Sequence, residues 1–330
     1  MKVVVCVRYG LDNLSIKEIP EPVPGDKEVL VQIHASCVNT NNLVGITGKP
    51  FLTRLFGPGL IKPKCMIPGR DFAGIVKGIG RDVKQFRSGD EVFGHSINDG
   101  AYAEFISVPE NVLALKPVNI SFEEAAATPE SALVALNALR NTGHIKSGMN
   151  VLIYGASGGI GTFSVQIAKS FGAEVTGVCG TGNIEMVRSI GADHVIDYTR
   201  EDFVKNRQTY DLIHAAVGYR SVFDYKRALS PKGIYVATGG SAKAGFMPMA
   251  QIFQVMLIGS LVSEKDGRQL CFAHLDHIEQ NDLVFIKELI EAGKVKPVID
   301  RCYPLSKVAE AVNYYGKGHS RGKIAITVSH

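Results

Sequence analysis

Short apolar runs separated by glycine and proline dominate the first third of the chain. Residues 3–7, 29–34 and 74–79 have the length and composition of strands, with turn-forming residues between them. The segment 51–68 is interrupted by glycine and proline and is long for a connection without regular structure. We therefore expect a β-rich first region and a loop at 51–68 that lids a pocket.

The pattern changes near Ser121, where a hydroxyl residue precedes Glu123 and Glu124, as at a capped helix start. Beyond it, short apolar runs alternate with segments of helical spacing. Strands are predicted at 151–154, 174–179, 194–196, 211–217, 234–238 and 257–262, with a helix at 184–190. Fully apolar strands separated by helices indicate a parallel sheet covered on both faces.

The alternation ends after about residue 265. A helix is predicted at 282–292, a strand at 298–303, a helix at 307–315 and a terminal strand at 323–328. The terminal strand resembles the strands of the first region in composition, so we expect the carboxy-terminal segment to complete the first domain. The prediction is an α/β protein with one domain formed by 1–122 and 265–330 and another by 123–264.

The composition gives no support to some classes of function. The net charge is +4 without a basic run, so no nucleic-acid partner is expected. No apolar run reaches the length of a membrane span, and residues 1–6 read as a strand and not as a signal peptide. The six cysteines lie far apart without a CxxC spacing. These features predict reduced thiols and a cytoplasmic location.

The sharpest motif is a glycine-rich loop between the predicted strand 151–154 and a helix. Small residues here allow a pyrophosphate to reach backbone amides and the positive end of the helix. Ala156 occupies the first glycine position of GxGxxG, and a tight structural turn is the alternative. The predicted phosphate loop is Gly155, Ala156, Ser157, Gly158, Gly159, Ile160 and Gly161.

The residues at the end of the next strand indicate which nucleotide is bound. An NAD site places an acid about 20 residues after the glycines, whereas the first acid after Val178 is Glu185, inside the next helix. Hydroxyl and amide donors at Thr181 and Asn183 favour NADPH. The remaining residues predicted to contact the cofactor are Cys179, Gly180, Tyr198, Val217, Thr238 and Gly239.

Several strings, in order along nearly the whole chain, resemble medium-chain dehydrogenases. They are GRDFAG at 69–74, GDEVFG at 89–94, GAYAEF at 100–105, GASGGIG at 155–161 and GADHVIDY at 191–198. The resemblance implies a GroES-like β-rich catalytic domain and a Rossmann domain with a doubly wound parallel sheet. It also places Tyr198 near the adenosine end of the cofactor, with a packed surface tyrosine as the alternative.

The chain resembles the zinc-free, quinone-oxidoreductase-like (zeta-crystallin-like) branch. Positions that hold catalytic zinc in other members are occupied here by Asn39, Arg70 and Pro129 or Glu130. These residue types do not supply a tetrahedral set of three protein ligands, and the four-cysteine zinc lobe is absent. We therefore predict no metal, and an inert thiol at Cys37.

Without a metal, quinones and α,β-unsaturated carbonyls are easier hydride acceptors than simple carbonyls, because charge delocalises. Candidate donors to the acceptor are Asn39, Arg70 and Thr128. The alternatives are a turn asparagine, a surface ion pair of Arg70 and a structural hydroxyl. Tyr102 is predicted to be core. Residues 43–50 lack tyrosine, which leaves quinone and enone reduction equally open.

The predicted function is therefore an NADPH-dependent quinone or enone reductase. The alternatives are an NADPH-binding protein with little turnover, as some lens crystallins of this branch suggest, and a zinc-type alcohol dehydrogenase. The apolar run 255–262 reads as an exposed edge strand that a twofold copy would cover. This run predicts a homodimer.

Overall fold

The computed structural model describes residues 1–55, 59–218, 220–238, 255, 267–273, 279–318 and 320–329. The chain divides into two compact units. The first comprises Met1–Glu130, His277–Glu291 and Ile299–His330, and the second comprises Ser131–Asp276 and Ala292–Val298. The carboxy-terminal segment Ile299–His330 lies in the same unit as Met1–Glu130.

The first unit is built on a seven-stranded, mostly antiparallel sheet. Its order is β14-β15-β3-β4-β5-β7, and β6 pairs with β3. A separate pair, β1 and β2, is antiparallel. The strands are β1 (Lys2–Cys6), β2 (Leu14–Glu18), β3 (Glu28–Val38), β4 (Asp71–Ile79), β5 (Glu91–His95), β6 (Phe105–Pro109), β7 (Leu113–Leu115), β14 (Ile299–Pro304) and β15 (Lys323–Thr327).

Four α-helices accompany these strands in the described part of the first unit: α1 (Thr40–Thr47), α2 (Phe122–Ala126), α8 (Gln280–Glu291) and α9 (Val308–Gly316). Short 3-10 turns lie at Leu11–Asn13, Phe51–Leu55, Glu110–Val112 and Leu305–Lys307. The start of α2 is as predicted, because Ser121 accepts from the Glu124 amide and the Glu124 carboxylate accepts in return from the Ser121 amide.

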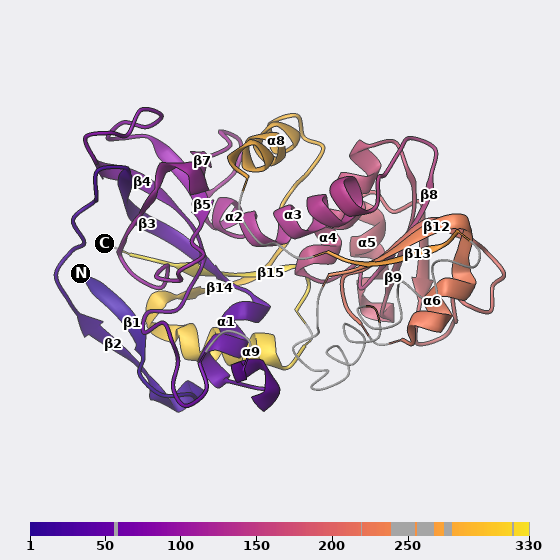
Figure 1. Ribbon diagram of the computed structural model, residues 1–330, viewed down its shortest axis with the longest axis horizontal. Helices are drawn as coiled ribbons and strands as arrows, with labels where there is room; N and C mark the ends of the chain where they lie inside the picture. The colour runs from indigo at the N-terminus through magenta and orange to yellow at the C-terminus, as the bar shows by residue number, and fades with distance from the viewer. Residues whose placement is uncertain are drawn as a thin grey trace. The chain divides into compact units, whose positions relative to one another are not determined.

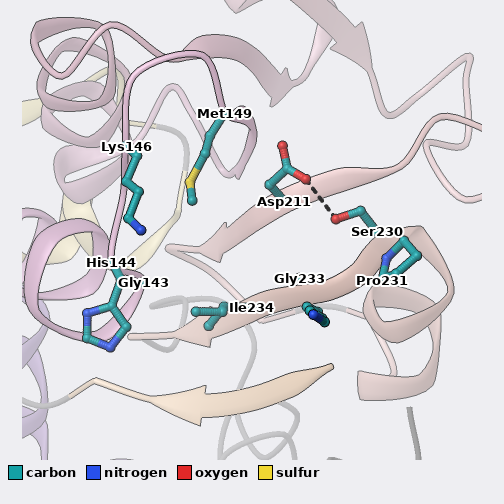
Figure 2. Close-up of a pocket in the computed structure, with 10 residues that line it drawn as sticks. Gly143, His144, Lys146, Met149, Asp211, Ser230, Pro231, Gly233 and Ile234 are labelled. Carbon is teal, nitrogen blue, oxygen red and sulfur yellow. Dashed lines mark hydrogen bonds between the residues drawn. The ribbon is translucent and has the colours of Figure 1, made fainter. Parts of the chain in front are cut away.

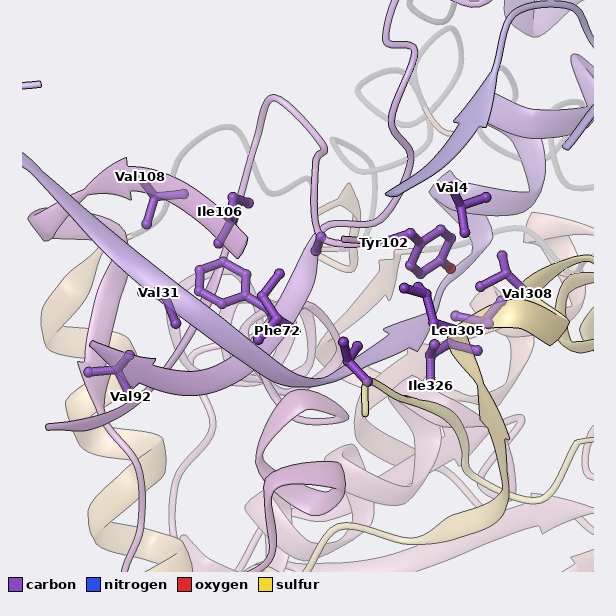
Figure 3. Packing of buried hydrophobic residues seen from close by; sticks show 14 of the residues in the cluster. Val4, Val31, Phe72, Val92, Tyr102, Ile106, Val108, Leu305, Val308 and Ile326 are labelled. Carbon is purple, nitrogen blue, oxygen red and sulfur yellow. The ribbon is translucent and has the colours of Figure 1, made fainter. Parts of the chain in front are cut away.

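A continuous apolar core fills the first unit. Figure 3 shows Phe72, Val31 and Ile106 packed near one another, and Tyr102 beside residues of the carboxy-terminal segment, including Leu305 and Ile326. The last strand, β15, pairs antiparallel with β3 through Ile324 to Thr327 (yellow beside indigo in Figure 1). Residues of the carboxy-terminal segment therefore pack in the same core as the amino-terminal strands.

The second unit is built on a six-stranded parallel sheet of order β10-β9-β8-β11-β12-β13. In chain order this is 3-2-1-4-5-6, the doubly wound nucleotide-binding arrangement. The strands are β8 (Asn150–Tyr154), β9 (Glu174–Cys179), β10 (His194–Asp197), β11 (Tyr210–Ala215), β12 (Leu229–Ala237) and β13 (Gln269–Phe272). The order reverses between β8 and β11, where such folds bind their ligands.

Helices pack on this sheet as the alternation predicts. Helix α4 (Gly159–Ser170) contacts β8 and β9, α5 (Ile184–Ser189) contacts β9 and β10, and α6 (Val222–Ala228) contacts β12. Helix α3 (Pro129–Leu136) continues into a π-helical turn at Asn137–Thr142, and a 3-10 turn at Thr181–Asn183 precedes α5. The GroES-like and Rossmann fold class predicted from the sequence is confirmed.

The boundaries differ from those predicted. Strand β13 extends the parallel sheet past residue 264, and residues 292–298 also lie in the second unit. The four-residue β13 is too short to register as a strand in the sequence. The loop 51–68 contains the 3-10 turn Phe51–Leu55. The predicted strand 257–262 and Gly239 lie outside the described residues.

Candidate functional site: a glycine loop and a buried charged cluster

The glycine loop lies between β8 and α4 in the conformation that small residues permit. Gly155 has φ of +84°, which disfavours any side chain. A Cβ on Gly161 would lie 2.0 Å from the Gly155 carbonyl oxygen, so this helix residue must also be glycine. A Cβ on Gly158 would meet Gly155 O only at 3.5 Å. The loop therefore needs Gly155 and Gly161 for its shape and leaves space beside Gly158.

The amino end of α4 is chemically open. Gly158 is the N-cap and supplies no side-chain acceptor to the first turn. First-turn amides lack intrahelical acceptors and lie at the positive end of the helix dipole. An anion such as a pyrophosphate supplies both the missing acceptors and the complementary charge. The loop therefore fits the phosphates of a dinucleotide.

An acid lies beside the carboxyl end of β9, although neither that end of the strand nor the turn after it contains one. Asp197, the last residue of β10, pairs in register with Cys179 of β9. Its Oδ2 accepts from the Thr181 hydroxyl at 2.5 Å, and its Oδ1 accepts from the Thr199 hydroxyl at 2.7 Å. The Thr181 bond, followed by the bonds from Thr199 and attraction to Arg200, lowers the pKa of Asp197. Thr181 is thus already committed as a donor.

Other residues predicted to contact the cofactor surround this end of the sheet. The Asn183 amide donates to the Ser157 hydroxyl at 3.2 Å. The Tyr198 side chain lies beside Gly180, where a Cβ would be 3.3 Å from the phenol oxygen. Val217 packs against Gly155, Thr238 bonds to His214 at 2.9 Å, and Cys179 is buried. These residues gather at the carboxyl ends of β8, β9, β10, β11 and β12.

The second unit also has a shallow cavity of about 250 Å³ near the amino ends of β8, β11 and β12. Figure 2 shows His144 and Lys146 at its rim and Met149 beside them. Asp211 accepts from the Ser230 hydroxyl at 2.8 Å and from the Asn150 amide at 3.0 Å. Asp211, the carboxylate that lines this cavity, is therefore already hydrogen-bonded. The cavity lies away from the glycine loop.

A cluster of ionisable side chains is buried in the first unit, with Asp71 at its centre. Asp71 begins β4 and is completely buried. Its Oδ1 lies 2.5 Å from His95 Nδ1 at the end of β5. Its Oδ2 accepts from the Asn39 amide at 2.9 Å and the Cys37 thiol at 3.3 Å. The Glu130 backbone amide approaches both oxygens, at 3.2 and 3.3 Å.

The network continues through Asn39 to the last strand. Asn39 is the N-cap of α1, and its Oδ1 accepts from the buried ammonium of Lys323 on β15. Burial would lower the pKa of Lys323, but nearby Cys37, Asp71 and Glu130 raise it above its ordinary value. The buried cation and the Asp71 anion are therefore linked through one asparagine side chain.

Charge and burial set the protonation of the cluster. Burial opposes ionisation of Asp71, yet His95, Lys323 and the Asn39 amide together hold its pKa below the ordinary value. Burial would lower the pKa of His95, but its bond to Asp71 and the charges of Asp71 and Glu130 raise it. Burial raises the pKa of Glu130, against attraction to His95, and the charge of Asp71 raises it further.

The three predicted catalytic residues differ in their surroundings. Asn39 joins the cluster. Arg70 is an immediate neighbour of Asp71, but its guanidinium pairs with Asp99 at 3.1 Å, the surface-pair alternative. Thr128 is buried and donates to the Glu124 carbonyl at 2.8 Å, the structural alternative. Tyr102 is core as predicted, and its hydroxyl donates to the Cys37 carbonyl at 3.1 Å.

Sequence reasoning missed Asp71, His95 and Lys323 as members of one cluster. Asp71 lies in the GRDFAG string, and His95 follows GDEVFG. A lysine opening an otherwise apolar terminal strand was the available signal for Lys323. Cys37 was expected to be an inert thiol. Its thiol donates to Asp71 Oδ2 at 3.3 Å, and burial raises its pKa well above the ordinary value. The thiol therefore stays protonated.

The residues at the positions of the family's zinc ligands do not fit that metal. The Asn39 oxygen is taken by Lys323, and its amide nitrogen is a donor to Asp71. Arg70 brings a positive charge. A different trio, Asp71, His95 and Glu130, places one donor atom each within 4.8 Å of one another. Any negative charge on its two acids is already balanced in part by the Lys323 ammonium.

Comparisons with known proteins agree with this geometry. Residues 25–118 match the alcohol dehydrogenase GroES-like domain, and residues 190–326 match the zinc-binding dehydrogenase domain. The chain is 33% identical over 338 residues to a chloroplast envelope quinone oxidoreductase homolog of Arabidopsis thaliana, covering 96% of this chain and 94% of that protein.

A second relative is an NADPH-dependent alkenal/one oxidoreductase from Arabidopsis thaliana chloroplasts, 30% identical, with 96% of this chain and 76% of that protein covered. Among solved structures, the quinone oxidoreductase from Coxiella burnetii superposes with a TM-score of 0.86 at 25% identity, covering 100% and 99% of the two chains. The chain belongs to the medium-chain dehydrogenase/reductase family, and within it to the quinone-oxidoreductase-like branch.

No helix in the described part of the chain is both long enough and apolar enough to cross a bilayer.

Proposed function

We propose that this protein is an NADPH-dependent reductase of quinones or α,β-unsaturated carbonyls that works without zinc. The observation that carries the proposal is the uncapped amino end of α4 behind a loop that only small residues can form. The relatives' names, which include quinone oxidoreductase and alkenal/one oxidoreductase, support a nicotinamide cofactor and conjugated acceptors.

The roles of the residues follow from their positions. The amides of α4's first turn bind the pyrophosphate, and Asn183 and Tyr198 flank the adenosine end. The bound nicotinamide supplies a hydride. In the first unit, the Asn39 N–H that Asp71 does not accept and the Arg70 guanidinium nitrogens other than Nε donate hydrogen bonds that stabilise charge on the acceptor oxygen. Thr128 holds the adjoining chain. Lys323 and His95 supply positive charge beside Asn39 and Asp71, so this site carries its own cations.

The preference for NADPH rests on the absence of an acid at the end of β9 itself. Asp197 lies next to that end, but its oxygens are occupied by Thr181 and Thr199. Arg200 lies 3.7 Å from Asp197 and is 74% exposed, so it adds a cation at the surface there. We infer a moderate preference for NADPH over NADH.

A panel of quinones and enones, each tested with NADPH and with NADH, measures the activity directly. We expect NADPH oxidation with at least one conjugated acceptor. Tight NADPH binding without turnover on any acceptor would favour the crystallin-like alternative. Loss of activity on chelation, with recovery on adding zinc, would favour the zinc alcohol dehydrogenase alternative.

Gly158→Val tests the phosphate loop. The new side chain fits the fold, since the nearest atom to its Cβ is 3.5 Å away, but it fills the space beside the amides. We expect NADPH affinity to fall at least about 100-fold, roughly 2.7 kcal/mol, with an unchanged melting temperature. Gly45→Val is the control, because a Cβ there meets nothing within 4 Å. Unchanged affinity in Gly158→Val would place the phosphates elsewhere.

The assembly and location stay proposals. We propose a homodimer formed through the apolar run 257–262, which lies outside the described residues. Light scattering at micromolar concentration should give twice the 35.6 kDa chain mass, and a monomer would contradict the proposal. We also propose a cytoplasmic location, although curated relatives include chloroplast and mitochondrial proteins. Fractionation of cells expressing the full chain tests it.

A further inference from the structure

Glu130 has one carboxyl oxygen that nothing in the described chain satisfies. Its Oε1 accepts from the Asn41 amide at 2.9 Å. Its Oε2 is buried and has no hydrogen-bond partner. Among the described residues, its basic neighbour is His95 Nδ1, which lies 3.9 Å away, beyond hydrogen-bond distance. A buried bare oxygen on an ionised carboxylate is costly, so this oxygen needs either a donor or a proton of its own.

His95 cannot be that donor. Its Nδ1 faces Asp71 Oδ1 at 2.5 Å, and a ring nitrogen carries one hydrogen at most. Asp71 is held ionised by this bond and by its bonds from Asn39, Cys37 and the Glu130 amide. The negative charge of the pair is thereby fixed on Asp71. A second negative charge on Glu130, next to Asp71, is disfavoured.

We propose that Glu130 is held as the neutral acid and donates the proton on Oε2 to the acceptor that this enzyme reduces. The inference rests on the proposed function and adds the proton donor to it. Such a proton has no acceptor among the described side chains, which is what a group waiting for a substrate oxygen requires. Asp71, His95, Asn39 and Lys323 act as positioning residues that fix the charge around it.

The step balances for an enone. The β-carbon gains a hydride, with its electron pair, from the reduced nicotinamide, and the C=C electron pair shifts toward the carbonyl to place charge on oxygen. That oxygen takes the proton from Oε2, so the Glu130 O–H bond breaks and a carboxylate forms. The enol becomes the saturated ketone, and water returns a proton to Glu130. One hydride and one proton are consumed per turnover.

The groups that act on the Glu130 carboxyl come from several elements. They are His95 on β5, Asp71 on β4, Lys323 on β15 and Arg70 just before β4, with Cys37 and Tyr315 also affected by its charge. Burial and the Asp71 charge raise the Glu130 pKa, whereas His95, Lys323 and Arg70 lower it, and the balance is a rise. The neutral acid therefore persists to higher pH than in an ordinary glutamate.

Infrared spectroscopy tests the proton without any need for turnover. Intact wild-type protein is titrated across neutral pH beside Glu130→Gln and the control Glu123→Gln, which changes a glutamate of the same segment outside the cluster. We expect the carbonyl stretch of a buried neutral carboxylic acid in the wild type and the control, and its loss in Glu130→Gln. The same band in all three proteins would overturn the proposal.

Kinetics then test the role. Glu130→Gln should lower kcat with an enone at least about tenfold, leave the affinity for NADPH unchanged and remove the fall in kcat that the wild type shows as pH rises through the Glu130 pKa. Glu130→Asp should recover part of the rate. An unchanged pH profile would overturn the proton donor. If the wild type reduces no acceptor, the proposed function fails, and the infrared result still decides whether Glu130 is the neutral acid.

Metal analysis addresses the other use of the trio. Purified protein is incubated with zinc or manganese and desalted, and its metal content is measured for the wild type and Glu130→Gln. We expect no bound metal above the control level in either. One equivalent of metal in the wild type that is lost in Glu130→Gln would overturn the proposal, because the Oε2 position would then hold a cation and not a proton.

Discussion

Asp71 in the first unit and His214 in the second are both completely buried, yet their surroundings differ. Asp71 is surrounded by donors and two basic side chains. His214, on β11, lies in an otherwise apolar parallel sheet, with Nε2 2.9 Å from the Thr238 hydroxyl and Nδ1 unbonded to any described residue. Burial lowers its pKa to about 3. Around Asp71 the first unit buries charge by pairing it, whereas the second unit keeps His214 neutral.

This difference matches what each unit is proposed to do. A unit that exchanges protons with a substrate needs ionisable groups poised within a network. A unit that binds a dinucleotide through backbone amides needs a rigid sheet and an uncapped helix, and side-chain charge contributes little. Substitutions in either unit test this difference.

The largest effect is expected from Asp71→Leu. The variant leaves His95 and Lys323 as buried cations without their anion, and breaking a buried pair in this way costs about 3–5 kcal/mol. Denaturant unfolding measures the loss. The control is Asp26→Leu, which removes a surface pair with Arg81 whose side chains are 57% and 76% exposed, and should cost less than about 1 kcal/mol. Equal losses would mean that the cluster is no more coupled than a surface pair.

The two histidines should give opposite pH dependences. The folded pKa of His214 is depressed to about 3, so the unfolded chain takes up a proton first as pH falls below about 6.5. Stability should therefore decline toward acid pH, approaching about 1.4 kcal/mol per pH unit. His214→Gln should flatten this decline between pH 6.5 and 5.

His95 has a raised pKa in the fold, so its contribution is complete below about pH 6.5 and is lost as pH rises through the folded value. His95→Gln should therefore flatten the alkaline side of the stability curve and not the acid side. Unfolding curves at several pH values separate the two variants, and the same pH response in both would remove the distinction between the units.

The smallest effect concerns the choice of nucleotide in the second unit. Gly180→Asp places a carboxylate where a 2′-phosphate is proposed, and its Cβ requires the Tyr198 phenol, 3.3 Å away, to shift only slightly. We expect the ratio of NADPH to NADH affinity to fall about tenfold through charge repulsion. Asp197→Asn keeps acceptors for Thr181 and removes a charge, so the ratio should rise. Fluorescence titration with both cofactors measures the ratios, and shifts of the same sign would refute the placement.

Much of the second unit was predictable because its signals are local. Strand, glycine loop and helix follow one another between residues 150 and 170, and steric demand explains Gly155 and Gly161 directly. The hydrogen bond between Thr181 and Asp197 joins the 3-10 turn after β9 to the last residue of β10, 16 positions later. It depends on the register of β9 and β10, which single residues do not reveal, and so the acid at this end was missed.

The cluster in the first unit was predictable only in part, since its members come from distant strands. Asn39 was identified from a family position, but the contact between Asn39 and Lys323 spans 284 residues. Arg70 was likewise identified from a family position, whereas its neighbour Asp71 belongs to the cluster. Adjacent residues on an extended chain point to opposite sides. Their sequence neighbours do not say which side faces the core, and the structure assigns that side to Asp71.

The position of Lys323 on the last strand has a consequence for the making of the protein. Residues 1–130 leave the ribosome before residues 131–276 of the second unit, and β15 follows both. Until then the growing chain holds Asp71, Glu130 and Asn39 without their buried ammonium. Domains generally fold as they emerge, so the inserted nucleotide-type unit is the part able to mature during translation. The amino-terminal part of the first unit must wait until β15 has been synthesised.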